Sequence, residues 1–262
     1  MTTWTDAALY ARVRACLDHE LRLFASGPGS RLVERAGVLA AIVPGSPERS
    51  LFNSIARTDH AALLAAYDEL AAAYAAAGVR AFTIWLDPDD PADRAALIAR
   101  GHVLDARPQA MAAPLPDVTI PEVGDLDWRE TRDWSLVSRI NDAAYGFPPP
   151  GFAGVDGVIA PPWYAYVARL GADDVGCLMC VDADVDGTLD CGISAVATLP
   201  AAQGARIAPR LLGLALAQAR ARGCVTTSLQ ATTRGRPVYE RMGYRPLGAM
   251  EMWERRERTD GI

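Results

Sequence analysis

The sequence contains no lysine, so all 26 of its basic residues are arginine. The 32 acidic residues outnumber the basic ones, which leaves a formal net charge of -6 and a pI of about 5.1. This balance argues against a nucleic-acid-binding protein, because such a protein needs a basic face to displace counterions from phosphates.

Long apolar runs and closely spaced cysteines are also missing. No segment reaches the roughly 18 apolar residues that a membrane-spanning helix needs, and residues 1–6 lack the pattern of a signal peptide. The five cysteines suit a reducing cytosol, so we expect a cytoplasmic protein without a membrane partner. The 50% of hydrophobic residues in a chain of 262 allows one large domain or two of ordinary size.

The sequence offers little for a metal ion. Cys177 and Cys180 form a single C-x-x-C pair within a predicted strand, where residues three apart point to opposite faces. The histidines His19, His60 and His102 are scattered along the first half. We interpret the two cysteines as buried thiols and the histidines as structural or surface residues, and we expect no metal site.

Apolar spacing and stop signals predict an alternation of helices and strands. The predicted helices cover residues 7–24, 60–77, 92–100, 134–145, 207–222 and 237–242. The predicted strands cover residues 35–43, 79–86, 163–169, 176–181, 191–198, 225–231 and 244–253. Residues 35–43 form one or two short strands, and residues 244–253 form one strand or a pair. An acidic turn is expected at 182–190, a proline-rich crossover at 114–121, and an irregular Gly/Pro-rich loop at 146–162.

The two halves of the chain repeat one pattern. In each half an alanine-rich helix, a glycine, a strand, a turn and a short helix follow in that order. Gly78 and Gly101-His102 mark the first copy, and Gly223 and Gly243-Tyr244 mark the second. We infer a duplication, with a chance echo of a common helix-strand-helix unit as the alternative.

A candidate anion site lies in the second half. The strand at 191–198 leads through a glycine-containing turn at 203–208 into a long helix. The first N–H groups of a helix lack internal partners and attract negative charge. Gly204 is free to adopt a positive φ that turns successive N–H groups inward. Neither a P-loop nor a G-x-G-x-x-G motif is present, so the turn fits no nucleotide site of those two kinds.

Two runs in this region carry a family resemblance. V-A-T-L-P-A-A-Q-G-A-R-I-A-P-R-L-L occupies residues 196–212, and T-T-S-L-Q-A-T-T-R-G-R-P-V-Y-E-R-M-G-Y-R occupies residues 226–245. Together they resemble the GNAT N-acetyltransferase superfamily, whose hallmarks are Q/R-x-x-G-x-G/A at the pyrophosphate turn and Y-x-x-x-G-F/Y on a later helix. The resemblance covers most of residues 130–253.

The resemblance implies an α/β fold of two GNAT-like halves, each a twisted mixed β-sheet flanked by α-helices. We expect residues 1–116 to be a degenerate GNAT-like domain without a cofactor site. Residues 117–262 are then the GNAT acetyltransferase domain that binds acyl-CoA.

The resemblance also implies roles for individual residues. Tyr239 falls on the tyrosine that donates a proton to the departing CoA thiolate. Asp190, in the acidic turn, is a weaker candidate for the general base, which a water chain or a neutral amine can replace. In the family the strand holding Val196 and Thr198 splays from the next one and offers backbone groups to the pantetheine arm. The implied cofactor-binding residues are Val196, Thr198, Gln203, Gly204, Ala205, Arg206, Ile207, Ala208, Pro209 and Thr232.

The sequence departs from the family pattern in the turn and in the first half. Arg206 stands where a second glycine is usual, and it either reaches a CoA phosphate or points to solvent. Pro209 removes one possible N–H donor. In the first half, Asp59 precedes the long helix, where it caps the N–H groups that a phosphate needs. Leu97 stands where the tyrosine would be.

The function implied is transfer of an acetyl or small acyl group from acetyl-CoA to a small-molecule or peptide amine, by direct attack in a ternary complex. The alternative is a non-catalytic acyl-CoA-binding or regulatory module, and a purely structural pair of domains is a third possibility. Several aromatic residues near the loop at 146–162 either line an acceptor pocket or pack in the core. They are Tyr145, Phe147, Phe152, Trp163 and Tyr164.

Overall fold

The computed structural model describes residues 4–87, 90–147, 159 and 161–257. Within these residues the chain forms two compact units. One unit comprises residues 17–87, 90–108 and 249–257 and has a six-stranded sheet. The other comprises residues 4–16, 109–147, 159 and 161–248 and has a seven-stranded sheet. Both are mixed sheets flanked by helices, which confirms the predicted fold class.

The helices agree closely with the sequence periodicity, and each predicted helix is present with ends within one residue of the prediction. They are α1 (Asp6–Phe24), α2 (His60–Ala76), α3 (Pro91–Ala99), α4 (Trp134–Tyr145), α5 (Ile207–Ala221) and α6 (Arg236–Met242). Two short 3₁₀ turns are also formed, η1 (Leu115–Asp117) and η3 (Pro200–Ala202). Among the described residues no helix has the length and apolar character needed to span a bilayer.

The strands are longer and more numerous than the sequence suggested. The first half contains β1 (Arg31–Arg35), β2 (Val38–Ile42), β3 (Ser54–Arg57), β4 (Ala81–Leu86), β5 (Val103–Ala106) and β6 (Gln109–Pro114). The second half contains β7 (Asp127–Thr131), β8 (Trp163–Leu170), β9 (Asp173–Val185), β10 (Thr188–Thr198), β11 (Thr226–Ala231), β12 (Arg245–Ala249) and β13 (Glu251–Arg256).

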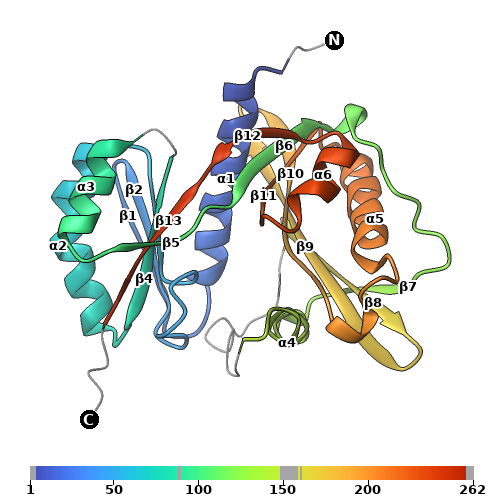
Figure 1. The fold of residues 1–262 in the computed structure, drawn as a ribbon, viewed down its shortest axis with the longest axis horizontal. Coiled ribbons are helices and arrows are strands. Elements are labelled where there is room, and N and C mark those ends of the chain that lie inside the picture. The colour runs from blue at the N-terminus through green and yellow to red at the C-terminus, as the bar shows by residue number, and fades with distance from the viewer. Residues whose placement is uncertain (1–3, 88–89, 148–158, 160, 258–262) are drawn as a thin grey trace. The chain divides into compact units, whose positions relative to one another are not determined.

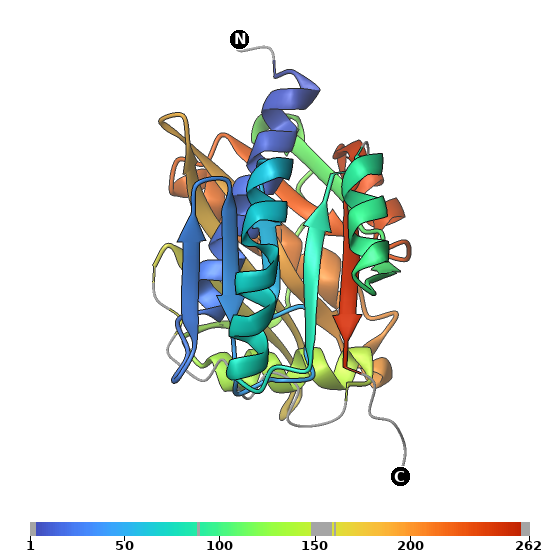
Figure 2. The same cartoon turned by 90° about the vertical axis from the view of Figure 1, so that its left-hand side faces the viewer.

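The six-stranded sheet has the order β1-β2-β3-β4-β13-β5. Its parallel pair, β3 and β4, is joined by α2, whose buried face consists of Leu63, Tyr67, Leu70 and Tyr74. This spacing is that of one face of a helix. Figure 2 shows α2 lying across this sheet, and the C-terminal strand β13, in red, among strands of the first half.

The seven-stranded sheet has the order β12-β6-β11-β10-β9-β8-β7, and its parallel pair, β10 and β11, is joined by α5. Cys180 on β9 belongs to the apolar core that includes the buried face of α5. Cys177 donates through Sγ to the backbone oxygen of Val137 on α4, 3.7 Å away. The two cysteines therefore face opposite sides of the strand, as predicted, with α5 on one side and α4 on the other (Figure 1).

The two sheets repeat one order. Strands β8, β9, β10, β11, β6 and β12 follow each other in the second sheet as β1, β2, β3, β4, β13 and β5 do in the first. In both sheets the third and fourth strands of this series are parallel and joined by a long helix. The predicted repeat is therefore present in three dimensions, with β7 as an addition to the second sheet.

The sheets do not follow the predicted division of the chain at residue 116. Strand β6 comes from the first half but lies between β11 and β12 in the second sheet, and β13 comes from the end of the chain but lies between β4 and β5. Each sheet thus holds one strand supplied by the opposite half. The sequence of a strand does not predict which strand it pairs with, because every half-buried strand shows the same alternation of apolar and polar residues.

The strands on either side of the expected acidic turn do pair as a hairpin, but the turn is much shorter than the predicted 182–190. Strands β9 and β10 continue through most of it, with Val185 paired to Thr188, so that only Asp186 and Gly187 form the turn. Both have positive φ, 53° and 76°, which is the conformation of the two-residue hairpin that Asp-Gly favours. The acidic side chains of this segment therefore lie along strands.

Gly213 on α5 is required by a close approach of backbone. A Cβ there would lie 2.0 Å from the backbone oxygen of Pro121. We predict that Gly213→Ala lowers the free energy of unfolding by about 1–3 kcal/mol through overpacking, although helix propensity alone would raise it by about 1 kcal/mol. Urea unfolding measures the change, and a stabilised variant would contradict this packing.

Candidate active site

The parallel pairing between β10 and β11 stops halfway along the strands. Its last residue pair is Ile193 with Leu229. On the other side of β10 the register with β9 shifts between Ser194 and Ala197, and Ala195 within this bulge has a φ of 49°. A bulge bends its strand and leaves backbone groups unpaired, so β10 leaves β11 at this point.

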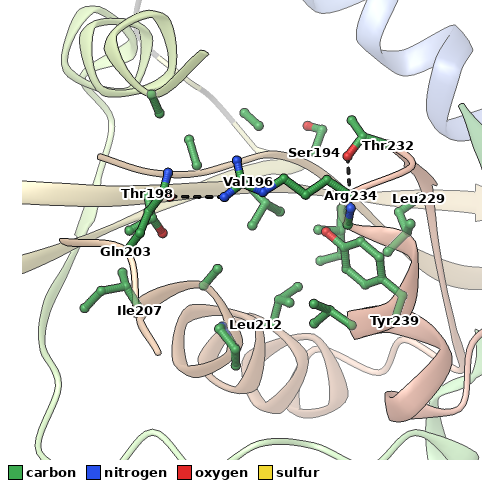
Figure 3. Close-up of a pocket in the computed structure, with 18 of the residues that line it drawn as sticks. Ser194, Val196, Thr198, Gln203, Ile207, Leu212, Leu229, Thr232, Arg234 and Tyr239 are labelled. Carbon is green, nitrogen blue, oxygen red and sulfur yellow. Dashed lines mark hydrogen bonds between the residues drawn. The ribbon is translucent and has the colours of Figure 1, made fainter. Parts of the chain in front are cut away.

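A cavity of about 490 Å³ lies at this break. Its walls are the second half of β10, the turn after it, the first turns of α5, the end of β11 and the start of α6 (Figure 3). Nine of the ten residues predicted to bind a cofactor line this cavity, together with Tyr239. The exception is Ala205, whose N–H donates to the backbone oxygen of Ala202 inside the turn.

The turn before α5 leaves the helix N-terminus open. Gly204 has a φ of 90°, as expected, and a side chain there would meet only open space. Arg206 is the N-cap residue, but its side chain makes no capping hydrogen bond. The N–H groups of the first helical turn have no helical partners, and the helix dipole adds positive potential. This end of the cavity can therefore bind an anion.

Arg206 adopts a backbone conformation that normally belongs to glycine. Its φ and ψ are 55° and 30°, in the left-handed region. That conformation costs an L-residue about 1–2 kcal/mol. Both Gly204 and Arg206 thus have positive φ in this turn, and Arg206 is an exposed residue of the cavity lining.

Tyr239 is buried at the opposite end of the cavity. Its ring packs edge-on against Tyr244, with ring centroids 5.7 Å apart, and its hydroxyl points toward the space between β10 and α5 (Figure 3). Burial raises the pKa of Tyr239 above its ordinary value. The hydroxyl therefore stays protonated near neutral pH, which is the state that a proton donor needs.

Asp190 does not lie in a solvated turn, and that expectation is corrected. It is completely buried on β10. Its two carboxylate oxygens accept hydrogen bonds from Thr226 Oγ1 at 2.6 Å and from Ser228 Oγ at 2.5 Å. Burial raises the pKa of Asp190. It is not part of the cavity wall, so it has no direct contact with a ligand bound there.

The predicted residues on the two strands take distinct positions in the wall. Val196 lies in the bulge, and Thr198 Oγ1 is a buried atom without a hydrogen-bond partner among the described residues. Thr232 follows β11, and its Oγ1 accepts from the N–H of Gly235 at 3.1 Å. This bond fixes the loop that leads into α6.

Tyr145 lines the cavity, in agreement with one of the two alternatives that the sequence left open for it. Tyr145 at the end of α4 donates through its hydroxyl to the backbone oxygen of Val196, 3.2 Å away. Three polar residues of the cavity were not identified from the sequence. They are Ser194 on β10, Gln230 just beyond the last residue of β11 that pairs with β10, and Arg234 in the loop before α6. The sequence pointed to Arg234 in one way only, by an arginine in the loop between the predicted strand at 225–231 and the predicted helix that contains Tyr239.

The aromatic residues near the loop at 146–162 divide into two groups. Tyr145 and Phe147 are exposed and stacked, with ring centroids 6.1 Å apart, and Tyr145 also lines the cavity. Trp163 is buried, and Tyr164 lies under the guanidinium of Arg222 at 3.8 Å. Phe152 lies outside the described residues, as does most of that loop.

The corresponding place in the six-stranded unit is occupied by the protein's own side chains. Asp59 caps α2 by accepting from the N–H of Ala62 at 2.6 Å, as the sequence predicted. Nearby, the buried Arg57 forms ion pairs with Asp90 and Asp93, and Asp93 also contacts His60. His60, Asp90 and Asp93 lie close enough to share an ion, but both carboxylates already form ion pairs with Arg57.

Leu97, in the position where the second half has its tyrosine, is completely buried in the core of the six-stranded unit. The side chain has no group that donates a proton. The first half therefore lacks the chemistry that Tyr239 offers at the end of the other cavity.

The comparisons with known proteins point in one direction. Residues 161–246 match the family described as the acetyltransferase (GNAT) domain. No curated protein sequence matches the chain. A solved GCN5-related N-acetyltransferase from Kribbella flavida is similar with a TM-score of 0.67 at 17% identity, and the match covers 93% of this chain and 94% of that chain.

Two further structures share this fold over nearly their whole length. A functionally unknown conserved protein from Staphylococcus epidermidis gives a TM-score of 0.61 at 12% identity, covering 86% of this chain and 93% of that chain. A tandem GNAT protein from the clavulanic acid biosynthesis pathway gives 0.55 at 13% identity, covering 94% and 89%. At these identities the likeness concerns the fold.

The strain at Arg206 leads to a stability prediction. Arg206→Gly should raise the free energy of unfolding by up to about 1 kcal/mol, because relief of about 1–2 kcal/mol of left-handed strain exceeds the added unfolded-state entropy of about 0.4–1 kcal/mol. Arg206→Ala is the matched control, since it removes the same side chain but keeps the Cβ. Chemical denaturation that ranks the alanine variant above the glycine variant would contradict the assigned conformation.

Proposed function

We propose that this chain transfers an acetyl or small acyl group from acyl-CoA to an amine. Residues 161–246 match an acetyltransferase (GNAT) domain, and nearly the whole chain shares the fold of a solved tandem GNAT protein. The observation that carries this proposal is one cavity with three features. They are the uncapped N-terminus of α5, the diverging strands β10 and β11, and the buried hydroxyl of Tyr239.

The cavity suits the cosubstrate in size and in the order of its polar groups. Its volume of about 490 Å³ falls in the range of small-molecule sites, about 300–1,000 Å³. The turn from Gln203 to Pro209 would hold the pyrophosphate at the helix N-terminus. The backbone groups of Val196 and Thr198 would bind the pantetheine arm, and Thr232 would lie beside it.

The chemistry follows from these positions. The cosubstrate supplies the acyl group as a thioester, and the acceptor nitrogen attacks the thioester carbonyl directly. Backbone N–H groups of β10 freed by the bulge would polarise that carbonyl. Tyr239 would give its proton to the departing thiolate. Holding both reactants in one cavity supplies a large part of the rate by positioning.

The acceptor meets no carboxylate in the described wall of the cavity, because Asp190 is buried on β10 behind two hydroxyl groups. We therefore propose that the amine arrives uncharged or loses its proton to water. The exposed pair of Tyr145 and Phe147 supports a small-molecule or peptide amine with an apolar part. The five cysteines are free, buried thiols, which supports a reducing, cytoplasmic setting.

One observation favours a second candidate function, a non-catalytic acyl-CoA-binding or regulatory module. The turn before α5 carries a strained Arg206, and the third residue of α5 is Pro209, which has no N–H to donate. Such a turn could hold the ligand in a less productive position. A module of this kind would bind acetyl-CoA without releasing free CoA thiol in the presence of any amine.

Replacement of Tyr239 tests the catalytic role. Tyr239→Phe should lower kcat by about 10²–10⁴-fold, the usual contribution of a positioned acid, with little change in the affinity for CoA. Thiol release with a panel of amine acceptors gives kcat, and calorimetry gives the affinity. Tyr244→Phe is the control, since that neighbouring hydroxyl bonds Thr227 in the core and does not line the cavity. An unchanged kcat in Tyr239→Phe would remove this residue from the mechanism.

The contrast between the two halves predicts the stoichiometry of binding. Titration calorimetry should give one CoA per chain, because Asp59 already caps α2 whereas α5 is open. CoA at a hundred times its dissociation constant should stabilise the folded state by about 2.7 kcal/mol. Gly204→Val should abolish this shift by forcing a β-branched residue to a φ of 90°, and Asp59→Asn should leave it unchanged. Two equivalent CoA molecules per chain would overturn the assignment.

A further inference from the structure

Arg234 extends across the mouth of the cavity. It lies in the loop between β11 and α6, and its Nη2 donates to Gln203 Oε1 at 3.1 Å, in the turn before α5. Figure 3 shows the side chain reaching from the Thr232 side of the cavity past Val196 to Gln203. Both Gln203 and Arg234 are exposed. The contact therefore lies at the turn that would hold the pyrophosphate.

The hydrogen-bond partner of the Arg234 guanidinium, Gln203, is an uncharged side chain at the mouth of the cavity. Among the ion pairs of the described residues, its neighbour Arg236 pairs with Glu240 and Arg210 pairs with Asp125, but Arg234 pairs with no carboxylate. The bond to Gln203 also places this cation beside the positive end of the α5 dipole. Two positive features held together at a cavity mouth are stabilised when an anion joins them.

We propose that Arg234 is a movable strap that binds the pyrophosphate of CoA from the side opposite the α5 turn. On entry of the ligand its guanidinium leaves Gln203 and forms hydrogen bonds to phosphate oxygens. This inference rests on the proposed function, since it assigns a residue to the same site.

Replacing the hydrogen bond to Gln203 by hydrogen bonds to phosphate is favourable for the Arg234 guanidinium. A charge-assisted hydrogen bond from arginine to phosphate is about twice as strong as one to a neutral amide, and the planar fork can make two such bonds. The base of the loop stays in place, because Thr232 Oγ1 accepts from the N–H of Gly235. Only the long side chain needs to move. The phosphate is then held by backbone N–H groups on one side and by Arg234 on the other.

Binding measurements with three ligands test this assignment. They are CoA, dephospho-CoA, which lacks the 3′-phosphate, and pantetheine, which lacks all phosphates. Arg234→Ala should weaken CoA and dephospho-CoA by the same factor, about 10–100-fold, as expected for loss of a hydrogen bond to a charged group. The affinity for pantetheine should not change. The slope of log Kd against log salt concentration should become shallower for CoA, since one cation is lost.

Arg236→Ala is the matched control, because it removes the same charge two residues away from a side chain paired with Glu240. It should bind all three ligands like the parent protein. Arg234→Lys should recover only part of the affinity, because an ammonium lacks the fork. Equal melting temperatures of Arg234→Ala and the parent without ligand would show that the fold is intact.

Three results would overturn the strap. Arg234→Ala could bind CoA as tightly as the parent, while the parent still binds CoA; the inference then fails and the proposed function stands. The loss could be confined to CoA and absent with dephospho-CoA, which would move Arg234 to the 3′-phosphate. If the parent binds no CoA at all, the proposed function fails and the strap fails with it.

Discussion

The early end of the parallel pairing between β10 and β11 is the constraint on which the site depends. Strand backbone beyond Ile193 and Leu229 carries donors and acceptors that need partners, since unpaired polar groups are costly when buried. The bulge at Ala195 and Val196 prevents the sheet from closing over them. Those groups therefore face a cavity, where Tyr145 satisfies one oxygen and a ligand can satisfy others.

The sequence predicted the features that depend on residues close together in the chain. The helices follow from apolar spacing, the cap at Asp59 from residue type, and the open turn at Gly204 from its need for a positive φ. Features that depend on distant pairing were missed or misplaced. Asp190 seemed solvated because acidic residues surround it in sequence, yet hydroxyl groups on β11 enclose it. The exchanged strands β6 and β13 have no local signature at all.

The two units have the same strand arrangement around the long helix, but only one of them leaves the N-terminus of that helix available to a ligand. Each has a parallel strand pair joined by a long helix. In one unit a single carboxylate occupies the N-terminus of α2, and Arg57 is neutralised by two aspartates. In the other the helix begins at a residue that cannot cap it, with arginines at the rim. The two units thus share their strand order apart from β7 and differ in the charge at the start of the long helix.

The exchange of β6 and β13 bears on the history of the gene. A half that we propose binds no cofactor would ordinarily be free to disappear by deletion. Here its loss would also remove the strand between β11 and β12, and with it the neighbour that pairs along the whole of β11. Selection on either sheet therefore acts on residues of both halves. Once two copies have exchanged an internal strand, the loss of either copy breaks the sheet of the other.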